Sequence, residues 1–461
     1  MNQDTICALA TANGIGAIGI IRVSGEQAIE ICEKCFDGKA LTQQKSHTVH
    51  YGFIKDGDEV IDEVMISIFL APKSFTTENS VEISFHGSPH IGKRILEVLI
   101  KNGARMAKAG EFTMRAFMNG RIDLSQAESI ADLIASENEA SRKVALQQLK
   151  GGISHEISVL RNDLLNFVSL IELELDFAEE DVEFADRTAL VQLLQKIESK
   201  LKSLIDSFQY GNAIKSGVAV AIIGKPNAGK STLLNALLKE ERAIVSDIAG
   251  TTRDTIEEVL HIKGNAFRLI DTAGLRETED AIEAIGVVKA KEKVAQADVL
   301  VYLIDVATSD LKDDLAMLQE LAREDLKIII CLTKIDEVEQ AEQKAKAIAK
   351  ILQSEIPSHE LLQISAKENI HLQDLKDELS TYVEHLKSES NVVITNQRHY
   401  ESLQKSIDAV YKVKEAITHQ ISTELLAYEL RNALEHLGEI SGEFTNDEVL
   451  GNIFSKFCIG K

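Results

Sequence analysis

The segment GKPNAGKS at 224–231 places glycines, a lysine and a serine in the spacing G-x-x-x-x-G-K-S. It follows the apolar run VAVAII and precedes a leucine-rich helical pattern, so we expect a loop between a strand and a helix. In such a loop backbone N–H groups turn toward an anion, Lys230 adds a positive charge, and Ser231 offers a hydroxyl to Mg²⁺. The loop predicts a nucleoside triphosphate and leaves the base open.

Two later segments supply groups for the metal side of a triphosphate. SDIAGTTRD at 246–254 follows the first helix of this region, where it could reach the γ-phosphate, and its Thr252 is a second hydroxyl ligand. DTAG at 271–274 ends the apolar run FRLI and predicts a carboxylate, Asp271, beside the Mg²⁺. These segments agree with the loop in predicting a metal-bound triphosphate.

Two further segments indicate which nucleotide base is bound. TKID at 333–336 ends the apolar run KIIICL, and SAK at 365–367 ends LLQI. The Asp336 carboxylate can accept two hydrogen bonds from guanine N–H groups, and the Ala366 N–H can meet the guanine carbonyl oxygen. Either segment alone would be read as a solvated turn at a strand end, but five segments in this order predict GTP. Thr333 stands where asparagine is common, which leaves a bracing hydrogen bond open.

The predicted GTP-binding residues lie in these five segments. They are Asn227, Ala228, Gly229, Lys230, Ser231, Thr232, Ser246, Asp247, Ile248, Ala249, Gly250, Thr251, Thr252, Asp271, Thr272, Ala273, Gly274, Thr333, Lys334, Asp336, Ser365, Ala366 and Lys367.

The residue after the DTAG segment is Leu275, where Ras-like GTPases carry the glutamine that orients the attacking water. A leucine cannot orient water, so another polar group must do so. The acidic residues that follow are candidates, and each could equally belong to a solvated loop: Glu277, Glu279, Asp280 and Glu283. Arg253 and Arg276 are near, but neither can be assigned as a charge-neutralising finger, and a bound cation could take that role.

Four segments together resemble the MnmE (TrmE) family of bacterial tRNA-modification GTPases. They are NAGKS at 227–231, DIAGTTRD at 247–254, DTAGLRE at 271–277 and the terminal FCIGK at 457–461. The match covers the whole chain, from DTICALAT at Asp4 onward. The resemblance implies that K⁺ replaces an arginine finger and that G domains meet face to face to complete the site.

The resemblance also implies ligands. Asn227, Ser246, Ile248 and Thr251 would hold K⁺, Ser231 and Thr252 would hold Mg²⁺, and Glu283 would be the catalytic residue that orients water. The family usually has a threonine at the position of Ser246, which keeps the carbonyl and the hydroxyl.

The resemblance also indicates a second candidate site in the N-terminal segment, formed by Arg22, Glu82 and Arg121, which spacing alone does not select. A buried glutamate can accept paired N–H donors from a pterin edge, and arginines can hold the carboxylates of a folate tail. Each of these residues could equally form an ion pair at the edge of the core. The resemblance implies that they bind a 5-formyl- or methylene-tetrahydrofolate together with Lys461, and that Arg121 replaces a lysine of some relatives.

Length and pattern predict three parts of mixed α/β class. From a length of 461 residues and a hydrophobic content of 44% we expect two to four domains. We expect an α/β folate-binding-like domain at 1–119 that dimerises, an all-α helical bundle at 120–215 and 384–461, and an inserted Ras-like P-loop GTPase domain at 216–383. Neither helical stretch looks able to bury its apolar face alone, which favours one discontinuous bundle.

The cysteine content and the net charge limit where the protein is located and which partners it binds. The five cysteines show no zinc-like spacing, and their odd number argues against a disulfide framework, which indicates a reducing cytoplasm. No basic leader or run of about 18 apolar residues supports export or a membrane partner. The net charge of −23 opposes non-specific binding to RNA, so tRNA would bind through local basic patches and a partner protein.

The resemblance implies the biological reaction. A homodimer would hydrolyse GTP and act with the FAD-containing MnmG (GidA) protein, in a heterotetramer, to add a carboxymethylaminomethyl group at C5 of the tRNA wobble uridine. The alternative is a regulatory GTP-dependent binding switch, for example in ribosome assembly. A membrane-remodelling GTPase would need an anchor that the sequence lacks. Cys458 has no histidine or aspartate partner that the sequence can assign.

Overall fold

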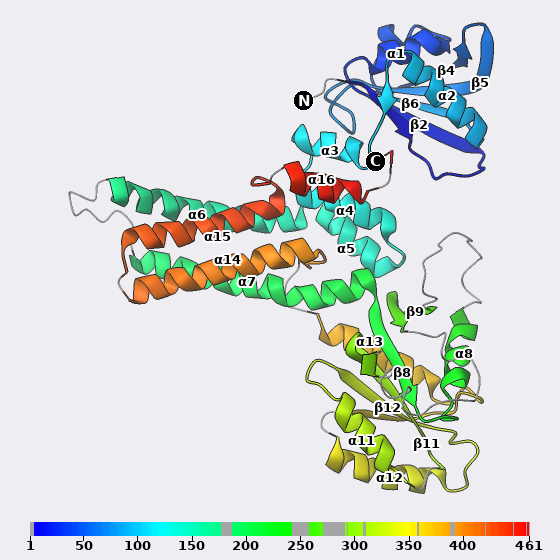
Figure 1. Cartoon of the computed structure of the whole chain (residues 1–461), viewed down its shortest axis with the longest axis vertical. Helices are drawn as coiled ribbons and strands as arrows, with labels where there is room; N and C mark the ends of the chain where they lie inside the picture. Colours follow the sequence, from blue (N-terminus) through cyan, green and yellow to red (C-terminus); the bar gives the residue numbers. More distant parts are fainter. Residues whose placement is uncertain are drawn as a thin grey trace. The chain divides into compact units, whose positions relative to one another are not determined.

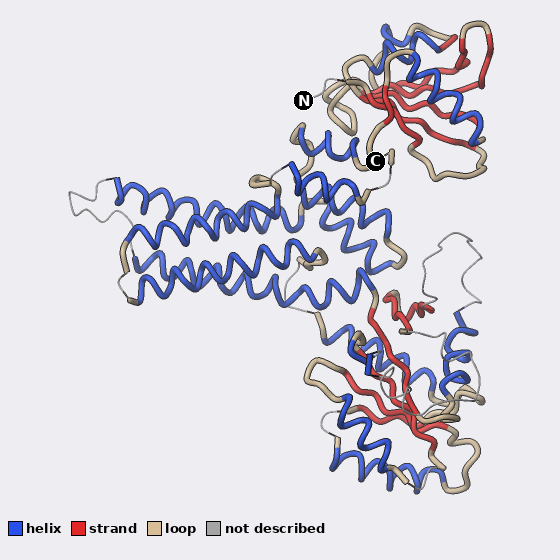
Figure 2. The backbone as a smooth tube through the Cα atoms, viewed as in Figure 1, coloured by secondary structure: helices blue, strands red, loops and turns tan. Residues whose placement is uncertain are grey.

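The computed structural model describes most of the chain. The described residues are 4–176, 187–241, 258–270, 291–292, 294–307, 310–356, 359–387, 392–419, 421–445, 447–457 and 459–460. They form two compact units, one of residues up to 135 with 145–194 and 405–461, the other of 136–144 with 195–404. Figures 1 and 2 show the helices and strands of each unit.

The N-terminal segment folds into a seven-stranded sheet with the order β3-β4-β5-β6-β2-β1-β7. Its strands are β1 Ile6–Leu9, β2 Ile18–Ser24, β3 Phe36–Asp37, β4 Thr48–Asp56, β5 Glu59–Phe69, β6 Ser80–His86 and β7 Arg105–Met106. Its helices are α1 Ala28–Cys35, the short 3₁₀ turn η1 Leu41–Gln43, α2 Pro89–Lys101 and α3 Glu111–Met118. All neighbouring strands are antiparallel except β1 and β7, which are parallel.

Alternation along the strands decides which face of this sheet is buried. In β2, Ile21 and Val23 are fully buried under α1 and α2, whereas Ile18 on the other face is 66% exposed. β6 repeats the pattern with Val81 and Ile83. Because side chains alternate across a strand, the opposite face is free to present Arg22 and Glu82, which are register partners.

Charged side chains fix the start of the chain to α3. Arg105 pairs with Asp4 and with Glu111, and Arg115 pairs with Asp4 at 3.0 Å and with Glu111 at 3.2 Å. Glu111 is only 3% exposed. Burial would raise its pKa, but hydrogen bonds and charge attraction from Arg105 outweigh burial and lower it. The network therefore holds Glu111 as a carboxylate inside the domain.

The helical residues come from two stretches of the sequence. The helices are α4 Leu124–Ala135, α5 Glu139–Leu149, α6 Gly152–Asp176, α7 Arg187–Ser216, α14 Gln397–Thr418, α15 Thr423–Ser441 and α16 Asp447–Ser455. α15 packs along α6 and also contacts α4 (Figure 1). Gly151 has φ +88° and separates α5 from α6, which begins at Gly152.

The residues between α7 and α14 form a P-loop-type α/β domain. Its sheet has the order β13-β12-β11-β8-β10-β9, and only β9 is antiparallel to its neighbour. The elements are β8 Val218–Gly224, α8 Lys230–Glu241, β9 Glu258–Ile262, β10 Asn265–Leu269, β11 Val299–Asp305, α11 Lys312–Leu321, β12 Lys327–Thr333, α12 Ala341–Glu355, β13 Glu360–Gln363 and α13 Leu372–His385.

Helices cover both faces of this sheet. One core joins the strands to α8 and α13, and a second core joins their other face to α11 and α12. Strands buried on both faces read as continuous apolar runs, which is why VAVAII and KIIICL predict them. The carboxyl ends of β8, β12 and β13 lie at one edge, since these strands are parallel. The predicted fold class is confirmed: an N-terminal α/β domain, a helical bundle and an inserted P-loop domain.

In the part of the chain that the structure describes, no helix is long and apolar enough to cross a bilayer.

Candidate functional site

The GKPNAGKS segment forms the predicted loop between β8 and α8. Asn227 has φ +63° and Gly229 φ +97°, so the backbone makes the left-handed turns that point N–H groups inward. A Cβ on Gly224 would come within 2.6 Å of the Leu303 carbonyl oxygen, so only glycine fits there. Lys230 Nζ donates to the carbonyl oxygens of Gly224 at 2.7 Å and Lys225 at 2.8 Å. The lysine that should meet phosphate is thus held over the loop.

A buried carboxylate anchors this loop from outside. Lys225 Nζ lies 2.9 Å from Oδ2 of Asp314, in the first turn of α11, and Asp314 is 2% exposed. The buried hydroxyl of Tyr302, on β11, donates to the other oxygen of Asp314 at 3.1 Å. Burial alone would lower the pKa of Lys225, but the hydrogen bond and charge of Asp314 outweigh it and raise the pKa. Three elements thereby fix one residue of the phosphate loop.

Thr333 supplies the brace that its sequence position left open. Its buried Oγ1 lies 2.9 Å from the carbonyl oxygen of Ala228, in the phosphate loop, and 3.3 Å from that of Ile304. A hydroxyl can donate one hydrogen bond, and the shorter contact is the one to Ala228. A threonine therefore ties the end of β12 to the phosphate loop without an asparagine amide.

The two base-reading segments are joined to each other. A hydrogen bond with the Ser365 side chain lowers the pKa of Asp336, so this exposed carboxylate is ionised at neutral pH. Ser365 is buried, and its N–H and carbonyl pair with Ile370 at 3.1 and 2.9 Å. Lys334 has φ +59° and its ammonium lies 2.7 Å from Asp305. The structure thus presents an anionic acceptor beside the loop that carries the Ala366 N–H.

The predicted metal-binding and catalytic residues lie partly outside the described residues. Within them, Asn227 and Ser231 are exposed at the phosphate loop and offer an amide oxygen and a hydroxyl, which are ligands that hard cations accept. The segments that lie outside the described residues hold Ser246, Asp247, Ile248, Ala249, Gly250, Thr251, Thr252, Asp271, Thr272, Ala273, Gly274 and Glu283.

In the N-terminal domain Arg22 and Glu82 face each other across β2 and β6. Both Nε and Nη2 of Arg22 donate to the same oxygen of Glu82, at 3.0 and 2.8 Å. The Arg22 guanidinium carbon lies 5.2 Å from the ring centre of Phe75 and 5.7 Å from that of Phe112. The two residues form an ion pair at the edge of the core, next to these aromatic rings. The Arg22 side chain is 21% exposed and the Glu82 side chain 27%.

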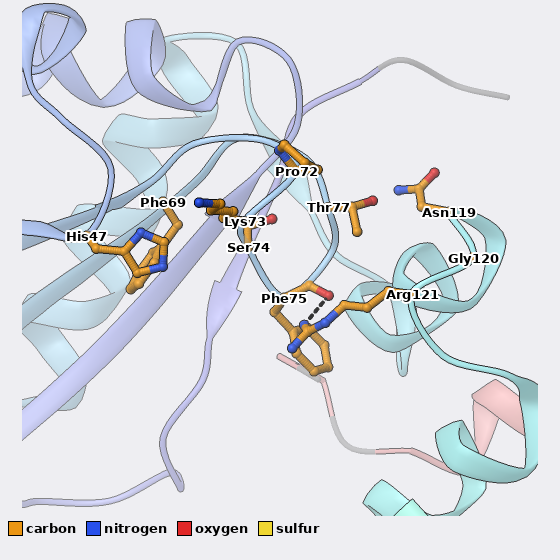
Figure 3. Close-up of a pocket in the computed structure, with 10 residues that line it drawn as sticks. All are labelled: His47, Phe69, Pro72, Lys73, Ser74, Phe75, Thr77, Asn119, Gly120 and Arg121. Atoms are coloured by element: carbon orange, nitrogen blue, oxygen red, sulfur yellow. Dashed lines mark hydrogen bonds between the residues drawn. The ribbon is translucent and has the colours of Figure 1, made fainter. Parts of the chain in front are cut away.

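Arg121 reaches the same aromatic ring from the residues after α3. Its guanidinium carbon lies 5.0 Å from the Phe75 ring centre, and Nη1 donates to the Phe75 carbonyl oxygen at 2.5 Å. Figure 3 shows this contact beside a cavity of about 630 Å³. The structure therefore brings Arg22 and Arg121 to the same aromatic ring, with Glu82 paired to Arg22.

The chain end returns to this sheet. Ile459 forms a β-bridge with Ala109, and a Cβ on Gly460 would come within 2.1 Å of the Leu9 carbonyl oxygen. Leu9 belongs to β1, the neighbour of the strand that carries Arg22. The predicted folate residue Lys461 directly follows Gly460 and lies outside the described residues.

Sequence reasoning missed Asp314, Tyr302 and Phe75. The signal for Tyr302 was present, because a tyrosine inside the apolar run VLVYLI needs a buried partner for its hydroxyl. Asp314 and Phe75 carry no local signal, since their roles arise from contacts with residues far away in the sequence.

Comparison with known proteins covers the whole chain. The family profile described as "GTP-binding protein TrmE N-terminus" matches residues 5–121, and that described as "MnmE helical domain" matches 124–458. The chain belongs to the MnmE family. A relative named "tRNA modification GTPase MnmE" from Flavobacterium psychrophilum is 53% identical, and the match covers 100% of this chain and 99% of the relative. MnmE of Bacteroides fragilis is 50% identical, with 100% of each chain covered.

Solved structures that resemble this MnmE chain include GTP-binding proteins. Era in complex with MgGDPNP and a 16S ribosomal RNA fragment is 28% identical, with a TM-score of 0.29, and the match covers 42% of this chain and 66% of that one. Era of Aquifex aeolicus is 26% identical, with a TM-score of 0.28, covering 41% and 66%. At these scores the likeness carries no argument about function.

Proposed function

We propose that this chain is a GTP hydrolase that works in tRNA modification. One observation carries the proposal: Thr333 at the end of β12 donates to Ala228 of the phosphate loop, and Asp336 and the Ser365–Lys367 segment follow the ends of β12 and of its parallel neighbour β13. The chain is also MnmE-like along its whole length. Such a site accepts GTP and rejects adenine nucleotides, because adenine lacks the paired N–H donors that a carboxylate reads.

In this proposal different residues bind the phosphates, hold the cations and orient the attacking water. Backbone N–H groups of the loop and Lys230 bind the β- and γ-phosphates, and Ser231 with Thr252 would hold Mg²⁺. Asn227, Ser246, Ile248 and Thr251 would hold K⁺. Held there, the two cations would supply the positive charge that an arginine supplies in other GTPases. Glu283 would orient the attacking water.

Folate binding supplies the one-carbon unit in this proposal. Arg22, Glu82, Arg121 and Lys461 would bind 5-formyl- or methylene-tetrahydrofolate. The approach of Arg22 and Arg121 to the Phe75 ring and the pairing of Glu82 with Arg22 support this proposal. Glu82 would exchange its contact with Arg22 for pterin N–H donors, and the arginines would hold the tail carboxylates.

A second copy of the chain would cover the open face of the N-terminal sheet. Val49 and Tyr51 on β4 are each 55% exposed, and Met65 on β5, the register partner of Tyr51, is 46% exposed. Contiguous exposed apolar side chains on a sheet mark interaction surfaces. The homodimer would join the FAD-containing MnmG protein in a cytoplasmic heterotetramer acting on the C5 position of the tRNA wobble uridine. We also propose that the N-terminal domain spans 1–119 and the G domain 216–383, and that the helical bundle is formed by 120–215 and 384–461.

Mass spectrometry of tRNA nucleosides tests the pathway. A strain that lacks this chain should lose the C5 carboxymethylaminomethyl group at the wobble uridine and regain it with the native chain, but not with Lys230→Ala. Unchanged wobble uridine in the deletion strain would refute the modification role and fit a regulatory GTP-dependent switch instead.

The cation and the catalytic glutamate are tested in vitro. Replacing K⁺ by Na⁺ should slow GTP turnover at least about tenfold, since a lost transition-state charge contact costs more than about 1.4 kcal/mol. Glu283→Ala should leave GTP affinity within about twofold and abolish turnover. Equal turnover in the two salts would contradict the role of K⁺.

A further inference from the structure

The cavity beside Arg121 differs in charge from the chain as a whole. It measures about 630 Å³, within the range of small-molecule pockets, and none of its lining residues is acidic. Lys73 and Arg121 line it, in a chain whose net charge is −23. Figure 3 shows Lys73 on the side of His47 and Phe69, with Asn119 and Arg121 approaching from the residues at the end of α3. An uncompensated cationic lining of this kind favours an anionic ligand.

Unusual backbone conformations support a functional role for this cavity. His47 has φ +63° and Thr77 φ +65°, and both line it. A β-branched residue such as Thr77 rarely adopts this conformation, which costs roughly 1–3 kcal/mol and persists mainly at functional sites. Asn227 and Lys334, in the GTP site, show the same feature, and so do residues outside both sites, such as Lys263 and Gln340. The backbone strain at Thr77 therefore accompanies the charge and volume of this cavity and does not identify a site by itself.

The cavity adjoins the proposed folate residues. Arg121 lies over the Phe75 ring at 5.0 Å, and Arg22 approaches the same ring at 5.2 Å. Lys73 is exposed and has no carboxylate partner among the residues that the structure describes. A ligand that begins at Arg22 and Glu82 and passes Arg121 would carry its far end toward Lys73.

We propose that this cavity binds the γ-linked glutamate tail of the folate, with Lys73 as the main contact for carboxylates beyond the first. The Asn119 amide nitrogen donates one N–H to the Thr76 carbonyl oxygen at 2.7 Å, and its second N–H would be a further contact. Each added glutamate carries one free α-carboxylate, so a longer tail places further negative charges along the cavity. The inference rests on the folate binding proposed above and adds the chain-length specificity of that site. An RNA backbone is disfavoured, because two cations in a bounded cavity are few for a surface that must neutralise successive phosphates.

Calorimetry with the purified full-length chain tests this. The probes are monoglutamyl and pentaglutamyl 5-formyltetrahydrofolate, titrated into the native chain, Lys73→Met and the matched control Lys39→Met. Lys39 is likewise exposed but does not line the cavity. We expect the pentaglutamyl form to bind roughly three- to tenfold tighter than the monoglutamyl form, since each partly exposed charge contact is worth a few-fold at most.

Each outcome separates this inference from the folate proposal. The chain-length advantage should fall to less than about twofold in Lys73→Met, persist in Lys39→Met, and shrink in 0.5 M salt through screening. Equal affinity of the two folates for the native chain would overturn the inference and leave folate binding intact. Binding of neither folate would refute both. Lys73-dependent binding of a short oligouridylate, with no effect of folate length, would assign the cavity to nucleic acid and overturn the inference.

Discussion

The ion pair between the partly exposed Lys225 and the buried Asp314 gives the sharpest test of how this G domain holds its phosphate loop. Asp314→Asn keeps an acceptor for the Tyr302 hydroxyl and removes only the charge that faces Lys225. Breaking a fully buried pair costs about 3–5 kcal/mol. The Lys225 side chain is 37% exposed and can turn to water, so we expect about 1–1.5 kcal/mol, the lower range for a charged hydrogen bond.

That cost should appear as lost nucleotide affinity. A loop released from its anchor populates the binding-competent form less, and the apparent dissociation constant rises by the same factor. We expect GDP and GTP to bind Asp314→Asn roughly 5- to 15-fold more weakly, measured with a fluorescent guanine nucleotide. The rate of hydrolysis at saturation should change less than the affinity, because the variant alters loop order and not the reacting groups.

The neighbouring Asp313 is a matched control. It lies 3.4 Å from the same lysine but is 86% exposed, so Asp313→Asn should change affinity less than about twofold. Lys225→Met combined with Asp314→Asn should bind no worse than the weaker single variant, because the two residues act as one contact. Equal effects of Asp313→Asn and Asp314→Asn would refute the anchoring role of burial.

Two further predictions follow from particular contacts. Thr333→Val should weaken GDP binding roughly three- to tenfold, because the Ala228 carbonyl loses its hydrogen-bond donor, a loss of about 1 kcal/mol. Thr333→Ser keeps the hydroxyl and should bind GDP within about twofold of the native chain. Equal losses in the two variants would exclude the hydroxyl as the brace. The pKa of Glu111 is lower in the folded state than its ordinary value of 4.5, so the ionised carboxylate stabilises the fold at pH values above 4.5. This contribution is lost as the pH falls through the lowered folded-state pKa. Glu111→Gln should therefore melt lower at pH 7 and lose less further stability between pH 5 and 3, measured by calorimetric scans; parallel melting curves would contradict that assignment.

Much of the G domain could be predicted because its strands are buried on both faces. Continuous apolar runs locate β8 and β12, and the functional segments begin where these runs end. In the N-terminal sheet, β2 and β6 instead alternate between buried and more exposed residues, which is a local pattern of another kind. These features are local, so a sequence window contains the whole signal.

Contacts between distant segments could not be predicted in this way. β4 contains Gly52, which propensity would place in a turn, yet a Cβ there would come within 2.5 Å of the Phe36 ring. Phe75, in the loop between β5 and β6, contacts Arg22 and Arg121, which lie far away in the sequence. The brace from Thr333 depends on how β12 sits against the phosphate loop, which residue type alone did not reveal.

The central claim is that Asp336 and the phosphate loop together select a guanine nucleotide. Isothermal titration of the full-length chain with GTP and ATP, in K⁺ and Mg²⁺, measures that selection directly. The account predicts tight binding of GTP, no detectable binding of ATP, and loss of this preference in Asp336→Ala. Comparable affinity for the two nucleotides in the native chain would contradict it.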